Sequence, residues 1–551
     1  MWWHFSNPNA EGPRWLRAAG ITRMGYGFAE PWGLNDLAFQ LRFKLSSLSG
    51  TGRRTILQFH PIYHSMSSLI LPSRRRFLQG GLAGAAGLAF SSQMLARTIG
   101  ANDDIRLGFI GLGKGGGGRG AGHVGDFGKK KGCRVAAICD ADTAVLDAMK
   151  KKLDGQAVEY YQDYRKLLEN KDIDAVIIAT PNHTHTFLAI AAMQAGKHVF
   201  VEKPVSHNMW EGRKLVEHAA KHPELIVQHG MQRRSDDAWL KIQEFIKTGA
   251  IGKAVVSRGF CYKKREDIGK VASAGPAPAT VDYNLWCGPR EMAPVQRKSF
   301  HYDWHWQWPY GNGDIGNQGP HQLDVARWLV GDPMACPENV LSIGGRFGYD
   351  DDATTANTQI AFYDFKPVPV IFEVRGLPEK DMNFRGRLSN YKGIGVGNVI
   401  ECEGGWVAEG KAYDKDGKEV AKFEKNEGAK HQDRFLASIR SGKQEITHNA
   451  LTGHLSAALA HMANHSYRTG AETTIDAIKA KIGSNALFAE TFDRMITHLT
   501  DNKIELASIK PVLGASLTFD PVKEVYTGEN AEAANKFNME SYREGFTIPN
   551  A

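Results

Sequence analysis

The feature that most constrains the fold is a glycine-rich stretch between two apolar runs. IRLGFIGLG (105–113) has the composition of a buried β-strand and ends in a Gly-x-Gly pair, and CRVAAICD (133–140) has that of a second strand. Glycines let a backbone approach a pyrophosphate closely, and the N-terminus of the helix expected between the strands supplies N–H donors. The order of strand, glycine turn, helix and strand predicts a dinucleotide-binding Rossmann unit.

The turn itself is dominated by glycine, which fills nine of the positions 111–125. We assign the three fingerprint positions to Gly111, Gly113 and Gly116. An interior glycine weakens a helix by about 1 kcal/mol, so the turn is expected to be long and the third position stays open. Asp140 ends the second strand, where a carboxylate accepts hydrogen bonds from the adenosine ribose and repels a 2′-phosphate. The cofactor predicted is therefore NAD.

Further strands are expected at DIDAVIIAT (172–180), KHVFVEKP (197–204) and ELIVQHG (224–230), with a helical pattern before each of the last two. Ligands of open α/β sheets bind at the carboxyl ends of parallel strands. The residues that directly follow these strands are therefore candidates for the functional site.

Charge and cysteine spacing exclude several classes of protein. The net charge is +8, but residues 1–100 hold eleven basic against three acidic residues, which leaves 57 of each sign in the rest. Nucleic-acid binding by the folded part is therefore disfavoured. The six cysteines show no CxxC or CxxH spacing, so the sequence predicts neither a metal site nor a disulfide framework.

A short segment near the N-terminus has the pattern of an export signal. SRRRFLQ (73–79) carries adjacent arginines and precedes the mildly apolar GGLAGAAGLAF (80–90), which is too short to span a bilayer. We predict a twin-arginine signal and linker over 66–103, beginning at Met66, and a periplasmic protein whose mature form has no membrane span. Residues 1–65 show no sustained period and are expected to be disordered or not translated. A basic loop before a buried Ala/Gly helix is the alternative.

Three segments carry a family resemblance: ATPNHTH (179–185), GKHVFVEKP (196–204) and GDIGNQGPHQLD (313–324). They resemble the Gfo/Idh/MocA oxidoreductases, the family of glucose–fructose oxidoreductase and inositol dehydrogenase. The match runs from about residue 73 to 549, and the EKP triplet after a parallel strand is its most specific element.

The resemblance implies an α/β fold of two domains. An N-terminal Rossmann NAD-binding domain (104–229) is followed by a substrate-binding α/β domain (230–551) with a large, open, mostly antiparallel sheet. Strand-like runs such as AVVSRGFCY (254–262) and VPVIFEVRG (368–376) alternate poorly with helices, which agrees with such a sheet. A homo-oligomer formed through the open sheet is expected as well.

The resemblance also implies catalytic roles. Lys203 is placed between the nicotinamide and the substrate oxygen, where an ammonium stabilises developing negative charge. His321 is the implied acid/base, and its place at a helix N-terminus disfavours the cationic imidazole. Family members often carry aspartate where this chain has Asn317, so the partner that orients His321 is open between Asp324 and Asp314. A solvent-facing lysine and a helix-capping histidine are the structural alternatives.

The resemblance implies cofactor contacts for the two loops that follow the strands expected in 172–180 and 197–204. His185 is the implied positioning residue under the nicotinamide ribose, with a solvent-exposed loop histidine as the alternative. The other implied contacts are Thr180, Pro181, Asn182, Glu202 and Lys203.

The segment SFHYDWHWQWPY (299–310) places an aromatic residue at every second position. Alternation at period two predicts an extended strand with two chemically different faces. Aromatic faces stack on sugar rings and polar side chains bind hydroxyls, so we predict that Trp304, His305 and Trp306 contact a carbohydrate. The alternative is that the aromatic face belongs to the core.

Together these features favour an NAD-dependent oxidoreductase that acts on a sugar or sugar-derived hydroxyl. An exported enzyme meets no pool of NAD, so the cofactor is expected to stay tightly bound and to be regenerated on the protein. A redox-neutral, NAD-dependent glycoside hydrolase is the second candidate, and a non-catalytic sugar-binding protein is the third. The particular sugar and carbon are left open.

Overall fold

The computed structural model describes residues 104–378, 389–424 and 430–551. The expected signal and leader over 1–65 and 66–103 lie outside these ranges. None of the helices in the described ranges combines the length and the apolarity needed to cross a bilayer.

The first part of the chain forms a parallel sheet of six strands in the order β3-β2-β1-β4-β5-β6. Its strands are nearly continuous apolar runs because helices cover both faces, which buries every side chain of β4 and β5. This is the order of a Rossmann fold, so the fold predicted from the glycine turn is confirmed. The strands are β1 (Ile105–Ile110), β2 (Cys133–Cys139), β3 (Glu159–Tyr161), β4 (Ala175–Ile178), β5 (His198–Val201) and β6 (Val227–His229). The helices are α2 (Arg119–Gly128), α3 (Thr143–Lys152), α4 (Tyr164–Glu169), α5 (His185–Gln194) and α6 (Met209–Lys221).

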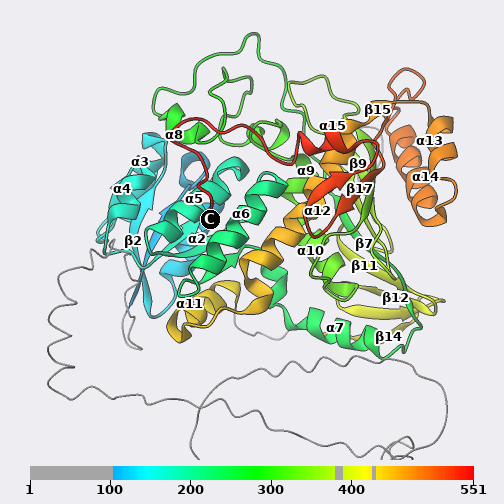
Figure 1. Ribbon diagram of the computed structural model, residues 1–551, viewed down its shortest axis with the longest axis horizontal. Coiled ribbons are helices and arrows are strands. Elements are labelled where there is room, and N and C mark those ends of the chain that lie inside the picture. Colours follow the sequence, from blue (N-terminus) through cyan, green and yellow to red (C-terminus); the bar gives the residue numbers. More distant parts are fainter. Residues whose placement is uncertain (1–103, 379–388, 425–429) are drawn as a thin grey trace, which may run out of the picture. The chain divides into compact units, whose positions relative to one another are not determined.

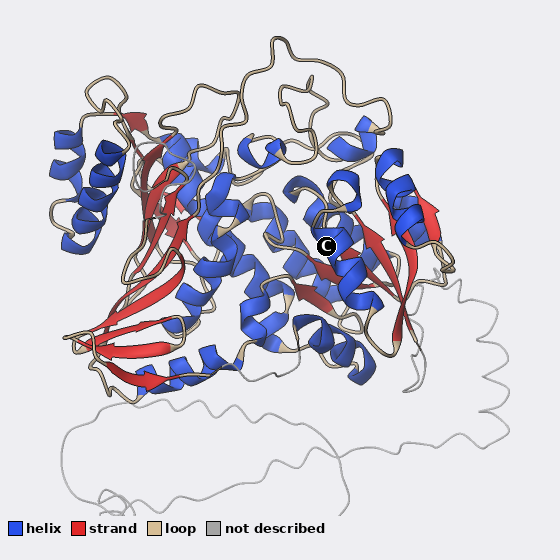
Figure 2. Cartoon of the chain, turned by 180° about the vertical axis from the view of Figure 1, so that it is seen from behind, coloured by secondary structure: helices blue, strands red, loops and turns tan. Residues whose placement is uncertain are grey.

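The second part forms a larger sheet of twelve strands, which Figure 2 shows as a separate group of red arrows. All its pairings are antiparallel except that of β7 with β10, so the predicted mostly antiparallel sheet is confirmed. The main strands are β7 (Ala254–Tyr262), β8 (Asn339–Gly345), β9 (Thr358–Tyr363), β10 (Val370–Arg375), β11 (Val396–Cys402), β12 (Gly405–Ala408), β13 (Lys411–Asp414) and β14 (Glu419–Lys422). The short strands are β15 (Ala471–Glu472), β16 (Val512–Leu513), β17 (Leu517–Asp520) and β18 (Val525–Thr527).

Two buried helices connect the sheets (Figure 1). α10 (Gly319–Leu329) packs on β7 and β11, and α12 (Ala450–Thr469) packs on β8 and on α6 of the Rossmann part. Sixteen of the twenty residues of α12 are buried, many of them alanine, so the helix fits closely between its neighbours. α10 is thereby fixed against the carboxyl-end side of the Rossmann sheet and carries His321 there.

The opposite face of the large sheet is partly covered. α13 (Ile475–Ile482) and α14 (Ala486–Asp501) bury Phe488 and Phe492 against β8 and β9. Next to them, the ring of Tyr391 stacks on Phe260 of β7, with centroids 5.2 Å apart.

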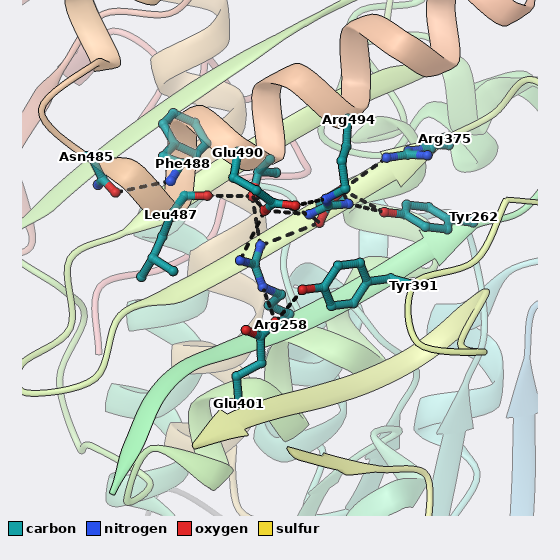
Figure 3. Close-up of polar contacts among 12 residues, drawn as sticks. Arg258, Tyr262, Arg375, Tyr391, Glu401, Asn485, Leu487, Phe488, Glu490 and Arg494 are labelled. Atoms are coloured by element: carbon teal, nitrogen blue, oxygen red, sulfur yellow. Dashed lines mark hydrogen bonds and ion pairs between the residues drawn. The ribbon is translucent and has the colours of Figure 1, made fainter. Parts of the chain in front are cut away.

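A polar network ties α14 to this face of the sheet (Figure 3). Arg494 of α14 donates to both oxygens of Glu373, at 2.9 and 2.7 Å, and the hydroxyl of Tyr262 donates to the same carboxylate at 2.6 Å. Arg258 donates to Glu401 at 2.9 Å beside them. Burial alone would raise the pKa of Glu373, but the neighbouring arginines hold it below its ordinary value. The carboxylate is therefore charged and is the shared acceptor of the network.

Glu373→Ala is expected to lower the free energy of unfolding by about 3–5 kcal/mol, because it leaves buried arginine charge without its partner. Glu419→Ala is the matched control: it breaks the exposed Lys411–Glu419 pair and should change the stability little, because solvent screens that pair. Urea unfolding of both variants measures the difference. Equal losses would contradict the view that Glu373 holds the network together.

Candidate active site

A cavity of about 900 Å³ lies between the carboxyl ends of the Rossmann strands, the N-terminus of α10 and the segment 299–305. Its walls include the glycine turn and the ends of β2, β4 and β5 on one side. The loop 299–305 and α10 form the other side, with Asn317 and His321.

The glycine turn is shaped for close contact with a ligand. Gly111 has φ +84° and a side chain there would meet Thr180 at 2.6 Å; Gly113 has φ +79° and would meet Gly118 at 2.8 Å. The first turn of α2 has no side-chain cap, because its N-cap residue is Gly118. Free N–H groups at a helix N-terminus are what a pyrophosphate binds. The turn therefore fits the phosphates of a dinucleotide.

The assignment of Gly116 as the third fingerprint glycine is corrected. Gly116 packs against Met149 and is absent from the cavity wall. At Gly120 a Cβ would lie 1.8 Å from the carbonyl oxygen of Gly111, so only glycine permits the helix to pack on the first strand. The reason is a short 3₁₀ turn, Lys114–Gly116, which moves the start of α2 to Arg119.

Asp140 lines the cavity at the end of β2. Its two oxygens accept hydrogen bonds from the backbone N–H groups of Leu112, at 2.8 Å, and Asp142, at 3.0 Å. Each carboxylate oxygen has a second lone pair, so the group can still accept from a ribose hydroxyl. The chemistry of this end of the cavity fits NAD.

A segment of the second domain, residues 280–281, lies against the same end of the cavity and is called the strap below. Val281 forms a β-bridge with Asp142, and the N–H of Thr143 donates to the carbonyl oxygen of Thr280 at 3.0 Å. His301, which lines the cavity, lies with Nε2 2.8 Å from the carboxylate of Asp142. Sequence reasoning missed this contact, because nothing local links residues 159 positions apart.

Lys203 and Glu202 follow β5 and face the middle of the cavity. Lys203 donates from Nζ to the backbone carbonyl oxygen of Asn317 at 2.6 Å, and the Asn317 side-chain oxygen lies at 3.5 Å. Burial lowers the pKa of Lys203. Burial opposes the charge on Glu202 too, but His123 and Arg119, each 2.8 Å away, hold its pKa well below the ordinary range. Arg119 lines the cavity as well and was missed, because the glycine-rich sequence does not show where the helix after the turn begins.

His321 stands in the first turn of α10 on the cavity wall. Its Nδ1 is buried and has no hydrogen-bond partner among the described residues. Burial, with the charge of Lys203, lowers the pKa of His321 to about 3, so the ring is neutral at working pH.

The predicted orienting partners of His321 are wrong. Asp324 is buried away from the cavity and accepts from Arg234, at 2.8–3.0 Å, and from Ser456, at 2.6 Å. Asp314 is paired with Arg265 at 2.8 and 2.9 Å. Asn317 contacts Lys203 instead. The i+3 spacing brings a carboxylate near a histidine in sequence. Arginines from other elements nevertheless bind the carboxylate, because charge-assisted arginine–carboxylate hydrogen bonds are stronger.

The predicted strand over 299–310 is also wrong, because this segment folds into turns and the 3₁₀ helix Asp303–Trp306. Asp303 reverses the chain by accepting from the N–H of Ser299 at 2.7 Å while its own N–H donates to the carbonyl of Ser299 at 2.9 Å. Both sets of side chains therefore reach the cavity, which is lined by Ser299, His301, Tyr302, Asp303, Trp304 and His305.

Trp304 and His305 lie in the cavity wall, and Trp306 does not. Trp306 is buried and packs on the guanidinium of Arg265, 5.4 Å from its ring. Its predicted substrate contact is corrected to a structural role, since the turn points it to the other side.

The loop after β4 supplies the floor of the cavity with Thr180, Pro181, Asn182 and His185. His185 is buried, and its ring nitrogens lie 2.6 Å from the carbonyl oxygen of Pro204 and 2.7 Å from that of Thr180. His185 thus holds the two post-strand loops together, and direct contact with a cofactor stays a prediction. Its neighbour His183 is buried against the carbonyl of Trp286 at 3.0 Å and does not line the cavity.

Asn317→Asp is expected to raise the pKa of Lys203, because a carboxylate beside Nζ favours the ammonium. The basic limb of the pH–rate profile should therefore move to higher pH. Gln318→Glu is the matched control, since it adds the same charge one residue away, where no contact with Lys203 exists among the described residues. Equal shifts in both variants, or movement of the acidic limb alone, would contradict the Asn317–Lys203 contact.

A Rossmann sheet whose glycine turn, lysine and histidines meet in one cavity defines a nicotinamide-dependent oxidoreductase fold. Residues 105–230 match the profile described as an oxidoreductase family with an NAD-binding Rossmann fold, and residues 240–382 match the C-terminal alpha/beta domain of the same family. The chain belongs to the Gfo/Idh/MocA oxidoreductase family.

Relatives in this family carry different names. Myo-inositol 2-dehydrogenase of Thermotoga maritima is 33% identical over 179 residues, which cover 32% of this chain and 48% of that protein. Glycosyl hydrolase family 109 protein 2 of Shewanella sp. (strain ANA-3) is 34% identical over 183 residues, 31% of this chain and 38% of that protein. The chain thus spans less than half the length of these curated relatives. Apo scyllo-inositol dehydrogenase from Lactobacillus casei is 20% identical in structure comparison, with a TM-score of 0.45 over 66% of this chain and 96% of the other.

Proposed function

We propose that the protein is an NAD-dependent oxidoreductase that acts on a CH–OH group of a sugar or a sugar-derived polyol and keeps its cofactor bound. The observation that carries this proposal is the partly buried Lys203, held by Asn317 in the same cavity as the glycine turn, His305 and His321. Relatives named as inositol dehydrogenases support a polyhydroxylated substrate.

The residues of the cavity have different roles in the proposed oxidation. Bound NAD would supply the hydride acceptor. Lys203 donates to the reacting oxygen and stabilises the negative charge that develops on it, an effect that is strong in a site with little water. His321 lies on the same wall and interacts with the hydroxyl through its ring.

The aromatic segment supplies the contacts that suit a sugar. Tyr302 is 45% exposed at the cavity wall, and Trp304 lies beside it. Aromatic faces of this kind pack on the C–H faces of sugar rings, and Asp303 and His305 offer acceptors for hydroxyls.

A redox-neutral glycoside hydrolase is the second candidate. Relatives named as glycosyl hydrolase family 109 proteins favour it, and the same lysine and histidines would serve a transient oxidation that acidifies the neighbouring C–H. The two functions differ in whether reduced cofactor persists.

The test is to purify the protein, measure bound nicotinamide, and add myo-inositol or methyl β-D-glucoside while following absorbance at 340 nm and products together. Lasting reduction is expected; product without lasting reduction would favour the hydrolase.

His321→Ala should slow the chemical step by roughly 10²–10⁴-fold and leave NAD binding intact, because the binding groove belongs to the Rossmann part. Full activity of His321→Ala would contradict its role.

We also propose that a homo-oligomer forms through the large sheet. The region that supports this lies over β12 and β13, beyond the cover of α13 and α14, where Trp406 and Tyr413 stack with centroids 5.3 Å apart and are partly exposed.

We propose further that the protein is exported folded through a twin-arginine signal at 73–90, a segment outside the described residues. Arg74 and Arg75 changed together to lysine should retain the protein in the cytoplasm, because the export machinery requires the arginine pair. Cell fractionation with an antibody measures the distribution, and Arg97→Lys, which lies outside the arginine run, is the matched control. Efficient export of the Arg74/Arg75 variant would count against the signal.

A further inference from the structure

The cavity holds a second histidine whose protonation is fixed by its neighbours. His305 lies in the 3₁₀ helix Asp303–Trp306, with Nδ1 2.6 Å from the backbone carbonyl oxygen of Tyr302. A carbonyl oxygen only accepts hydrogen bonds, so Nδ1 must carry the proton. The lone pair of the neutral ring is therefore on Nε2.

The ring of His305 is also held in orientation. It stacks on the indole of Trp304, with centroids 3.6 Å apart and planes 20° from parallel. Nε2 makes no hydrogen bond to another described residue and is not among the buried, unpartnered atoms, although His305 lines the cavity. The lone pair is thus available to a ligand in the cavity.

His321 presents the opposite pattern. Its Nδ1 is closed off from solvent and has no partner in the described part of the chain. A proton on that nitrogen would be an unpaired buried donor, which native structures tolerate less often than an unused acceptor. The proton therefore belongs on Nε2, where His321 is a hydrogen-bond donor to the cavity.

We infer that the two histidines have different roles in the proposed oxidation: His305 is the catalytic base that accepts the hydroxyl proton through Nε2, and His321 donates a hydrogen bond to the reacting oxygen. This inference rests on the proposed function. Bound NAD would accept the hydride from the carbon. The O–H bond breaks, its electron pair becomes the second C–O bond, and the proton moves to Nε2 of His305. Its Nδ1–H stays bonded to the Tyr302 carbonyl throughout.

The charges around the two rings do not change which histidine is the base and which is the hydrogen-bond donor. The positive charge of Lys203 lowers the pKa of both histidines. The charge of Arg265, which is itself paired with Asp314, also lowers the pKa of His305. Mainly through burial, the pKa of each ring lies at about 3, so both are neutral before the reaction. The difference between them comes from the partner of Nδ1, which only His305 has.

The first experiment needs no substrate. Diethyl pyrocarbonate acylates an accessible, unprotonated ring nitrogen, and peptide mass spectrometry locates the product. His305 should react faster than His321, the partly exposed His222 serves as a reactive reference, and the buried His123 and His198 as unreactive ones. Reaction of His321 but not His305 would overturn the inference whatever the protein oxidises.

The second experiment measures a single turnover with a sugar that the 340 nm assay has shown to react. His305→Ala should lower the rate of hydride transfer by roughly 10²–10⁴-fold and retain bound NAD and sugar affinity. Added imidazole should restore part of the rate, and more basic imidazoles should restore more. His305→Asn, which keeps a donor toward the Tyr302 carbonyl, controls for the fold of the loop and should be equally slow.

The same loss in His321→Ala without rescue by any imidazole is expected of a hydrogen-bond donor. A full rate in His305→Asn, or rescue of His321→Ala but not His305→Ala, would overturn the assignment. If His305 is acylated as expected but neither sugar is oxidised, the proposed function fails together with the proton transfer, and the tautomer of His305 stands.

Discussion

The site depends on one partly buried positive charge that joins the two domains. Lys203 belongs to the Rossmann part, and its Nζ is held by the backbone carbonyl of Asn317, just before α10. Removing an ammonium from water is costly unless neighbouring oxygens replace the lost hydration. The Asn317 carbonyl supplies such an oxygen and the negative charge of Glu202 favours the ammonium, so the charge stays where a reacting oxygen would need it. The same contact sets the distance between the end of β5 and the first turn of α10.

The carboxylates around Lys203 are bound by arginines. Asp314 and Asp324 are each bound by an arginine, Arg265 and Arg234, and so do not neutralise Lys203 by direct contact. Asp324 and Arg234 are completely buried, a pairing that costs stability if either partner is lost. Their role is to fix α10 against the η5 turn Gln232–Ser235, which positions the wall that carries His321.

The strap and the aromatic loop close the cavity from the second domain. The bridge from Val281 to Asp142 and the contact of His301 with the same aspartate place backbone and side chains over the groove where the adenosine end of NAD fits. A groove covered in this way agrees with an enzyme that retains its cofactor, as the proposed export of the folded protein demands.

The sequence by itself determined those features that depend on neighbouring residues. Gly111, Gly113 and Asp140 were found because a glycine turn and the strand after it require particular residues within a few positions, and Lys203 was found through the family resemblance of its motif. The tertiary structure decided the rest. Gly120 replaced Gly116 because helix packing, and not the spacing of glycines, selects the position without a side chain. The alternating segment 299–310 became turns because Asp303 and Ser299 offered the backbone closer partners than a neighbouring strand. The arginines that bind Asp314 and Asp324 come from elements that only folding brings together, so no local pattern in the sequence predicts these ion pairs.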